Sequence, residues 1–366
     1  MKELIVHIGG SKCASSSIQN LFTQNALFHK DGRSFKYIGY DANDKIINSN
    51  IIAEESNFPP HFFTTNISAE PKKLKTQLKS VIKDKCDVAI ISNEGLANPE
   101  WLTDEAFDCF ASNKFEISIY YAVRRHDHWL NSSWWQWGAF SETSLDRWIE
   151  NEKLSAKYLG VEKWLKLPNI KEFHCVDLQD GPVEIIATKL GIVNYDKSVI
   201  NSASSAEMLR FLIKNKSNLN RTVHSPLIEF ILNNELNYSG EKPPFVISRE
   251  KQISILHDYE TALSLNLDNN IKRVFSNHLT QLTEDLGRNK SKKGKSDYFS
   301  MSDFLNEPSS PKFLGRLNEL LVNRLHVPLE FSAEHYLYLN PDVRATGVNP
   351  YQHYLEFGIK EGRRIR

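Results

Sequence analysis

A lysine, two glycines and a run of serines directly follow the first apolar segment of the chain. Residues 4–8 read Leu-Ile-Val-His-Ile, and residues 9–18 read Gly-Gly-Ser-Lys-Cys-Ala-Ser-Ser-Ser-Ile. The apolar run predicts a buried strand, and the serines predict the start of a helix. Unpaired amides at a helix start, a lysine ammonium and serine hydroxyls together favour binding of an anion such as phosphate. The alternative interpretation is a surface turn capped by serines.

The spacing of this loop departs from two common nucleotide-binding loops. A Walker A loop needs a glycine directly before its lysine, whereas Lys12 stands between Ser11 and Cys13. The Gly-x-Gly-x-x-Gly fingerprint of dinucleotide-binding proteins is not formed either. The sequence therefore disfavours a nucleotide kinase and a dehydrogenase.

Two adjacent arginines follow a later run of Ile and Tyr residues that predicts another buried strand. The planar guanidinium group of Arg124 or Arg125 suits two-point binding of a phosphate. Ser132 lies eight residues after Arg124, and Ser133 lies eight residues after Arg125, so the spacing leaves a one-residue ambiguity. The strand register favours Arg124 with Ser132. An ion pair of either arginine with Asp127 is the structural alternative.

Apolar runs alternate with amphipathic segments through the first third of the chain. We expect strands over residues 4–8, 87–92 and 115–123. We expect helices from Ser15 to Gly32, from Pro71 onward and around Phe107–Phe110, with a loop-rich stretch over residues 41–70. This alternation predicts an α/β fold, a parallel sheet flanked by helices. The loops after Ile8, Ser92 and Val123 should then share one edge of the sheet, where ligands bind in such folds.

The loop after the second expected strand supplies a candidate general base, Glu94, because a carboxylate there could accept a proton from a substrate. Its structural alternative is an acid that caps a helix. His61 is the second candidate base, and His29 ranks below it. His126 and His128 form a His-x-His pair that is more typical of a surface helix start than of a zinc site. No metal is expected.

The loop over residues 9–18, which we call the anion loop, and the segment from Arg124 to Ser132 resemble the donor-binding motifs of bacterial sulfotransferases that use 3′-phosphoadenosine 5′-phosphosulfate (PAPS). The loop matches at His7-Ile8-Gly9, at Lys12 and at Ser15–Gln19, with Ala14 where the family often has glycine. Arg124 and Ser132 match the pair that holds the 3′-phosphate in this family. The resemblance covers roughly residues 1–200.

The resemblance implies a P-loop-like sulfotransferase fold and transfer of a sulfuryl group from PAPS to a hydroxyl or amine. Lys12 would stabilise the leaving oxygen, and Glu94 or His61 would act as the base. No lysine that could contact the donor stands beside Asn93, which leaves the role of that residue open. The donor-binding residues implied are Gly10, Ser11, Lys12, Cys13, Ala14, Ser15, Ser16, Ser17, Arg124 and Ser132.

Composition and charge narrow the class of protein. The 366 residues are 40% hydrophobic, and 45 Lys and Arg balance 45 Asp and Glu. This composition is that of a globular chain, and zero net charge disfavours a nucleic-acid partner. An apolar run of about 18 residues is missing, so no transmembrane segment is expected. The four cysteines form no Cys-x-x-Cys pair, and the short apolar stretch at the N-terminus is not a signal sequence, which favours a cytoplasmic chain with reduced thiols.

The remainder of the chain divides into a sulfotransferase-like domain over residues 1–286, a basic and polar linker over 287–312 and a small helical module over 313–366. Five basic residues in 288–295 indicate a solvated hinge, with peripheral contact to a membrane surface or an anionic polymer as the alternative. The end of the chain, from Phe331 through Asn340-Pro341, resembles a module found on bacterial glycosyltransferases. It implies a glycan or glycolipid acceptor and a role in polysaccharide biosynthesis.

Other interpretations stay open at this stage. Trp134, Trp135 and Trp137 could stack on a sugar, although such spacing more often reflects core packing. A kinase-like phosphoryl transferase that uses ATP, and a non-catalytic polysaccharide-assembly protein that keeps the fold, are the alternative functions. The sequence does not specify an oligomeric state.

Overall fold

The computed structural model gives the fold of most of the chain. The residues that it describes are 2–40, 45–55, 67–68, 70–97, 103–112, 115–141, 143–152, 161–195, 204–217, 232, 236, 238, 240–265, 267–288, 299–324, 326–328 and 331–365. The expected base His61 and the basic run over 289–295 lie outside these residues.

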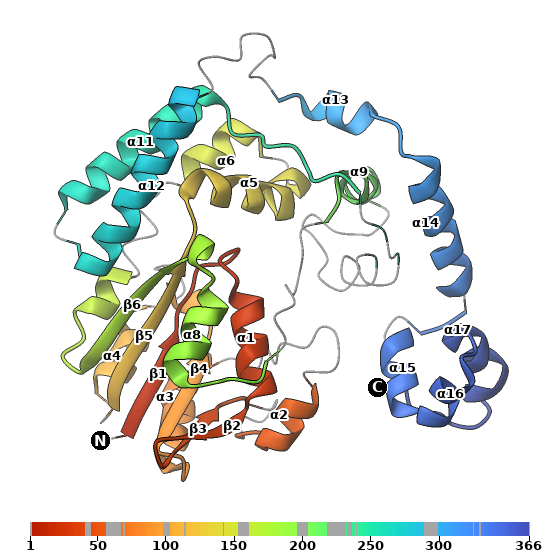
Figure 1. The fold of residues 1–366 in the computed structure, drawn as a ribbon, viewed down its shortest axis with the longest axis horizontal. Coiled ribbons are helices and arrows are strands. Elements are labelled where there is room, and N and C mark those ends of the chain that lie inside the picture. The colour runs from red at the N-terminus through yellow and green to blue at the C-terminus, as the bar shows by residue number, and fades with distance from the viewer. Residues whose placement is uncertain are drawn as a thin grey trace.

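A six-stranded, mostly parallel sheet forms the centre of the fold, in the order β2-β3-β4-β1-β5-β6 (Figure 1). All neighbouring strands are parallel except β2 and β3. The sheet confirms the expected α/β class with a parallel sheet. The strands are β1 (Lys2–His7), β2 (Leu27–Lys30), β3 (Arg33–Tyr37), β4 (Val88–Ser92), β5 (Phe115–Val123) and β6 (Ile170–Asp177).

Strands β1 and β4 end at the same level, and β5 between β1 and β6 continues to Val123. His7 at the end of β1 is paired in register with Ser92 of β4 on one side and with Tyr120 of β5 on the other. All five residues of β4 are buried, which explains why its sequence is a continuous apolar run rather than an alternating one. The loops that follow these strands therefore meet at one edge of the sheet, as expected.

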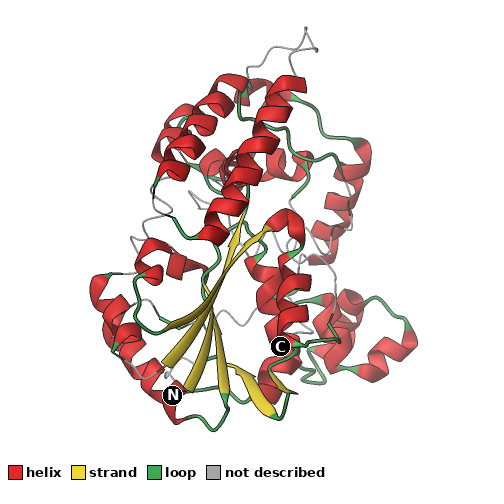
Figure 2. Cartoon of the chain, turned by 60° about the vertical axis from the view of Figure 1, so that its left-hand side comes forward, coloured by secondary structure: helices red, strands yellow, loops and turns green. Residues whose placement is uncertain are grey.

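Helices cover both faces of the twisted sheet (Figure 2). Helix α1 packs against α8, and helix α3 packs against α4. Pro71 begins α3, where its missing N–H costs nothing, and Leu74, Leu78 and Val81 form its buried stripe. The helices of this domain are α1 (Ser15–Gln24), α2 (Ser49–Glu55), α3 (Pro71–Lys83), α4 (Asp104–Ala111), α5 (His126–Gln136), α6 (Leu145–Asn151), α8 (Pro182–Leu190), α9 (Ala206–Lys214), α11 (Arg249–Ser264) and α12 (Asn269–Arg288).

The expected helix from Ser15 to Gly32 is wrong in its second half. The helix α1 ends at Gln24, and β2 and β3 then form an antiparallel hairpin. Asp31 and Gly32 connect the two strands with φ angles of 51° and 75°. An Asp-Gly pair with positive φ at both positions matches the right-handed twist of a hairpin, and this turn outweighs the helical spacing of Phe28. The expected loop over 41–70 also contains α2.

Two separate groups of buried side chains are found toward the C-terminus. Phe304 of α13 (Met301–Asn306) and Phe313 and Leu317 of α14 (Pro311–Arg324) join the main core, although the sequence places part of this stretch in a linker. A second cluster begins at Phe331, and Figure 1 shows its helices grouped beyond the end of α14. These helices are α15 (Ala333–Leu339), α16 (Pro341–Thr346) and α17 (Pro350–His353), followed by a π-helical turn (Tyr354–Gly358).

Both Asn-Pro pairs in this module start a helix, because proline fits the first helical position. None of the described helices is both long and apolar enough to span a membrane.

Candidate functional site

The anion loop between β1 and α1 has an unusual backbone. Lys12 and Ala14 adopt left-handed conformations, with φ angles of 63° and 65°, and the Cys13 amide donates to the Gly10 carbonyl at 3.2 Å. Left-handed residues at such a turn aim neighbouring amides toward a common point, which forms an anion-binding concavity. Non-glycine residues held there store about 1–3 kcal/mol of strain each. Such strain at a strand–helix junction indicates a functional loop.

The first turn of α1 has no acidic side chain that would offset the positive end of the helix dipole. Ala14 occupies the N-cap position, and its methyl group cannot accept a hydrogen bond from the amides that follow. Ser15 is buried, and its hydroxyl donates to the Gly10 carbonyl at 3.1 Å, which closes the loop. Ser16 and Ser17 are half-buried in the first turn. Ser15 therefore stabilises the loop, and the N-cap position belongs to Ala14.

Arg124 lies beside the anion loop. Its Nη1 donates to the Lys12 carbonyl at 3.5 Å, and no carboxylate forms an ion pair with it among the described residues. The side chain is half-buried, and burial lowers the pKa of its guanidinium, which stays charged at any ordinary pH. A half-buried cation without a protein counter-ion is suited to bind an anionic ligand.

Arg125 has a structural role instead. Its Nε donates to Asp127 at 2.8 Å and its Nη1 to Asp285 of α12 at 2.7 Å, and the side chain is buried. Burial alone would raise the pKa of Asp127, but the adjacent guanidinium holds it below its usual range. The expected alternative of an ion pair with Asp127 thus applies to Arg125, and it leaves Arg124 for a ligand.

Ser132 and Ser133 on α5 differ as the two arginines do, one being buried within the fold and the other more accessible. Ser133 is fully buried and donates to the Leu130 carbonyl at 3.1 Å. Ser132 is half-buried and lies three residues after Trp129, hence on the same face of α5. The Trp129 indole donates to the Ser11 carbonyl at 2.8 Å, so this face of the helix is turned toward the anion loop.

Glu94 lies across the loop from α1, in the 3₁₀ turn Glu94–Ala97 that follows β4. The side chain is exposed, but the surrounding loops desolvate its carboxylate and raise its pKa, while Lys12 and the Ser15 hydroxyl act to lower it. These three groups therefore lie close together. A carboxylate with a raised pKa is a stronger proton acceptor, which suits a general base.

Asn93 positions Glu94. Its side-chain oxygen accepts from the Gly95 amide at 2.8 Å, and its amide group donates to the Ile67 carbonyl at 2.8 Å. The residue whose role the sequence left open is thus the cap of this turn. The capping role that was the alternative for Glu94 belongs to its neighbour.

His7 is a residue that the sequence analysis did not assign to the site. It is fully buried under Gly9, where an added Cβ would come within 2.4 Å of His7 Nε2. Its Nδ1 lies 2.7 Å from the Ser92 hydroxyl, and burial lowers its pKa to about 3. The position was identifiable as the last residue of an otherwise apolar strand.

The structure also locates the histidines and tryptophans that the sequence offered as candidates. His29 is exposed on β2, at the outer edge of the sheet. His126 begins α5 as expected but is buried rather than on the surface, and no cluster of metal-ligating side chains exists within the described ranges. Trp134 and Trp135 are buried, as core packing predicts, and the Trp135 indole donates to the Pro244 carbonyl at 2.9 Å.

The site at the carboxyl edge of the sheet therefore combines a strained loop, an arginine that has no ion-pair partner among the described residues and a desolvated carboxylate. No family model, curated protein or solved structure matches this chain. The function must be argued from these groups.

Proposed function

We propose that the protein is a sulfotransferase that moves a sulfuryl group from PAPS to a hydroxyl or amine of a carbohydrate or glycolipid. The observation that carries the proposal is the contact between Arg124 and the Lys12 carbonyl, at 3.5 Å. This contact places the Arg124 guanidinium against the backbone of the loop that carries Lys12 and leads into α1. A ligand with anionic groups at both ends of a nucleoside matches that arrangement.

The roles of the residues follow from their surroundings. The left-handed loop over residues 10–14 and the serines of α1 would hold the 5′-phosphosulfate, and Arg124 with Ser132 would hold the 3′-phosphate. In the transfer, an acceptor oxygen forms a bond to sulfur while the bond from sulfur to the 5′-phosphate oxygen breaks. Lys12 would stabilise the charge that develops on the leaving oxygen.

Glu94 would accept the proton of the attacking hydroxyl. Desolvation raises the pKa of Glu94, which makes its carboxylate a stronger proton acceptor. The Lys12 ammonium acts against this rise in the pKa of Glu94, which indicates that the two groups are near enough to serve the same reaction.

The acceptor class rests on a different feature. The C-terminal module resembles one carried by bacterial glycosyltransferases, and this association favours a glycan or glycolipid acceptor in polysaccharide biosynthesis. Nothing in the proposed chemistry requires a metal, because a sulfuryl group carries less charge than a phosphoryl group.

The test compares nucleotides and then measures transfer. Calorimetric titration with adenosine 3′,5′-bisphosphate should give tighter binding than titration with ADP, and equal or tighter ADP binding would favour the kinase-like alternative. Labelled PAPS offered with a panel of glycans, followed by mass spectrometry, should yield a sulfated product. If Lys12→Ala and Glu94→Gln both left turnover unchanged, the assignment of the site would be wrong.

A further inference from the structure

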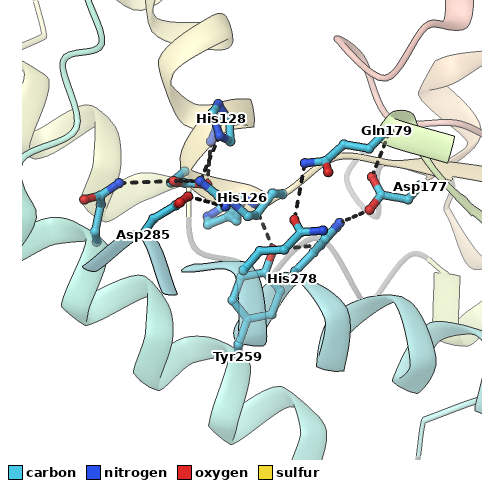
Figure 3. A network of polar contacts seen from close by, with 11 residues as sticks. His126, His128, Asp177, Gln179, Tyr259, His278 and Asp285 are labelled. Carbon is cyan, nitrogen blue, oxygen red and sulfur yellow. Dashed lines mark hydrogen bonds and ion pairs between the residues drawn. The ribbon is translucent and has the colours of Figure 1, made fainter. Parts of the chain in front are cut away.

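A chain of buried polar side chains connects the last strand of the sheet to the start of α5 (Figure 3). The His126 amide donates to the Tyr259 hydroxyl at 2.9 Å, this hydroxyl lies 3.1 Å from His278 Nδ1, and His278 Nε2 lies 2.7 Å from Asp177. Tyr259 and His278 are fully buried, and Asp177 is 5% exposed. We refer to Asp177, His278 and Tyr259 as the relay.

Every bond of the relay can be made at once. With a neutral imidazole, the Tyr259 hydroxyl accepts from the His126 amide and donates its proton to Nδ1 of His278. The Nε2–H of His278 then donates to the Asp177 carboxylate. Burial would raise the pKa of Asp177, but its hydrogen bond to His278 helps to hold it below the usual range. Buried networks that are fully bonded make the surrounding backbone rigid.

The relay and the sheet together fix the backbone on both sides of Arg124. In the ladder between β5 and β6, Val123 is paired in register with Asp177. The relay runs from Asp177 through the interior and returns to the chain at His126. The backbone of Arg124 is therefore fixed on its strand side by the sheet and on its helix side by the Tyr259 hydroxyl.

A second set of contacts fixes the neighbour of Arg124. Asp127 and Asp285 bind the Arg125 guanidinium, which also donates to His128 Nε2 at 2.8 Å, and Gln252 of α11 donates to Asp127 at 3.2 Å. Helices α11 and α12 thus contact this junction with Tyr259, His278, Gln252 and Asp285. They give Arg124 a fixed backbone while its own guanidinium stays without an ion-pair partner in the described part of the chain.

We propose that Tyr259, His278 and Asp177 are positioning residues that hold Arg124 for the 3′-phosphate of the donor and so set the selectivity for nucleotides that carry this phosphate. This inference rests on the proposed function. A bidentate bond from a guanidinium to a phosphate needs both groups in one orientation, so a shift of the Arg124 backbone weakens it. The 5′-phosphate, held by the anion loop, should not be affected.

The experiment measures two affinities in the full chain. Tyr259→Phe keeps the ring and removes the hydroxyl that joins His126 to His278. We expect adenosine 3′,5′-bisphosphate to bind about tenfold more weakly, because a displaced Arg124 loses one of its hydrogen bonds to the charged 3′-phosphate. The affinity for AMP should change by less than about twofold. Asp177→Asn, which keeps an acceptor for His278, should give a smaller loss in the same direction if Tyr259→Phe does not fold.

Tyr40→Phe is the matched control. The Tyr40 hydroxyl is also buried and donates to the Gln77 carbonyl at 3.0 Å, but it follows β3, which β4 and β1 separate from β5 in the sheet. This variant should lose stability without changing the ratio of the two affinities. A ratio that moves equally in both variants, or an equal weakening of both nucleotides in Tyr259→Phe, would show a structural role alone.

The two proposals fail in different ways. A wild-type chain that binds adenosine 3′,5′-bisphosphate no better than AMP would overturn both the donor assignment and the relay. A wild-type preference that Tyr259→Phe and Asp177→Asn retain in full would overturn the relay and leave the donor assignment intact.

Discussion

Helices α1 and α5 begin at the same edge of the sheet, after the neighbouring strands β1 and β5, and their first turns differ. The start of α1 has a left-handed alanine at the N-cap, no acid and a lysine just before it. The start of α5 contains Asp127, whose carboxylate accepts from the His128 amide, and the Tyr259 hydroxyl accepts from the His126 amide. In both helices the positive end of the helix dipole lies at this edge of the sheet.

The difference sets a helix start that the protein satisfies with its own groups against the helix start at which we propose a binding site. At α5 the protein supplies its own acceptors and acids, so the helix start is satisfied within the molecule. At α1 the N-cap alanine provides no acceptor, which favours an external anion. The adjacent arginines divide in the same way, because Arg125 is paired with two aspartates and Arg124 has no ion-pair partner in the described ranges.

Removal of the acid from the α5 start should have the largest effect. Asp127→Ala leaves the Arg125 guanidinium buried with one partner fewer, which should lower the free energy of unfolding by about 3–5 kcal/mol. Chemical denaturation measures this loss. Asp104→Ala removes a solvent-exposed partner of Lys163 and should have no measurable effect. A comparable change in both variants would mean that α5 is not stabilised from within.

Loss of the lysine at the α1 start should affect catalysis instead of stability. Lys12→Ala should lower kcat in the sulfuryl-transfer assay by about 10²–10³-fold, because an ammonium that stabilises a leaving oxygen acts mainly in the transition state. Its unfolding midpoint should stay near that of the wild type. Lys163→Ala, on the protein surface, is the matched control, and a loss of stability in Lys12→Ala without loss of rate would reverse the contrast between the two helices.

Arg124→Ala should weaken the donor more than the acceptor. A phosphate that loses its guanidinium partner loses about 2–4 kcal/mol of binding free energy, measurable by calorimetry with adenosine 3′,5′-bisphosphate. Arg33→Ala removes an exposed arginine that pairs with Glu3 and should bind as the wild type does. Unchanged affinity in Arg124→Ala would contradict the division of labour between the two arginines.

The two junctions should respond to acid in different pH ranges. His7 has a pKa of about 3 when folded against 6.5 when unfolded, so the unfolded chain binds the extra proton between these values. Its contribution is complete above pH 6.5 and is lost as the pH falls, by about 2 kcal/mol at pH 5. The lowered pKa of Asp127 matters only below its usual value of 3.8.

The comparison of the wild type with His7→Asn isolates the contribution of His7 to the pH dependence of stability. The difference in unfolding free energy between pH 7 and pH 5 should be smaller in the variant, because asparagine does not titrate and all other groups are shared. Equal differences in the two proteins would mean that His7 is protonated in the fold.

The smallest effect concerns backbone strain in the anion loop. Ala14→Gly should raise the free energy of unfolding by about 1 kcal/mol, since glycine adopts a φ of 65° without steric cost. Ala187→Gly, in the middle of α8, should lower it by about 1 kcal/mol. If both substitutions destabilise the protein, the left-handed loop is not strained.

Local patterns were sufficient to predict several features. Continuous apolar runs identified β4 and β5, and their loops were correctly placed at one edge because parallel neighbours end together. The anion loop was recognisable because its lysine, small residues and serines lie next to one another. The hairpin after α1 was missed because the spacing of Phe28 was weighed above the Asp31-Gly32 turn.

Features made of distant residues could not be predicted in this way. The relay joins Asp177, Tyr259 and His278, and nothing in the sequence near any of them indicates the other two. The sequence offered Asp127 as a partner for either arginine, and its pairing with Arg125 is joined by Asp285, which is 160 residues away from Arg125. Sequence spacing gives candidates for a site, and long-range ion pairs decide which of them remain available to a ligand.

The aromatic cluster around Phe331 and Tyr336 shares no buried member with the main core in the described part of the chain. The two clusters are packed separately, and Arg324 at the end of α14 joins them through its hydrogen bond to the Phe331 carbonyl at 2.7 Å. A truncation after α14 would therefore leave the buried side chains of the main core in place.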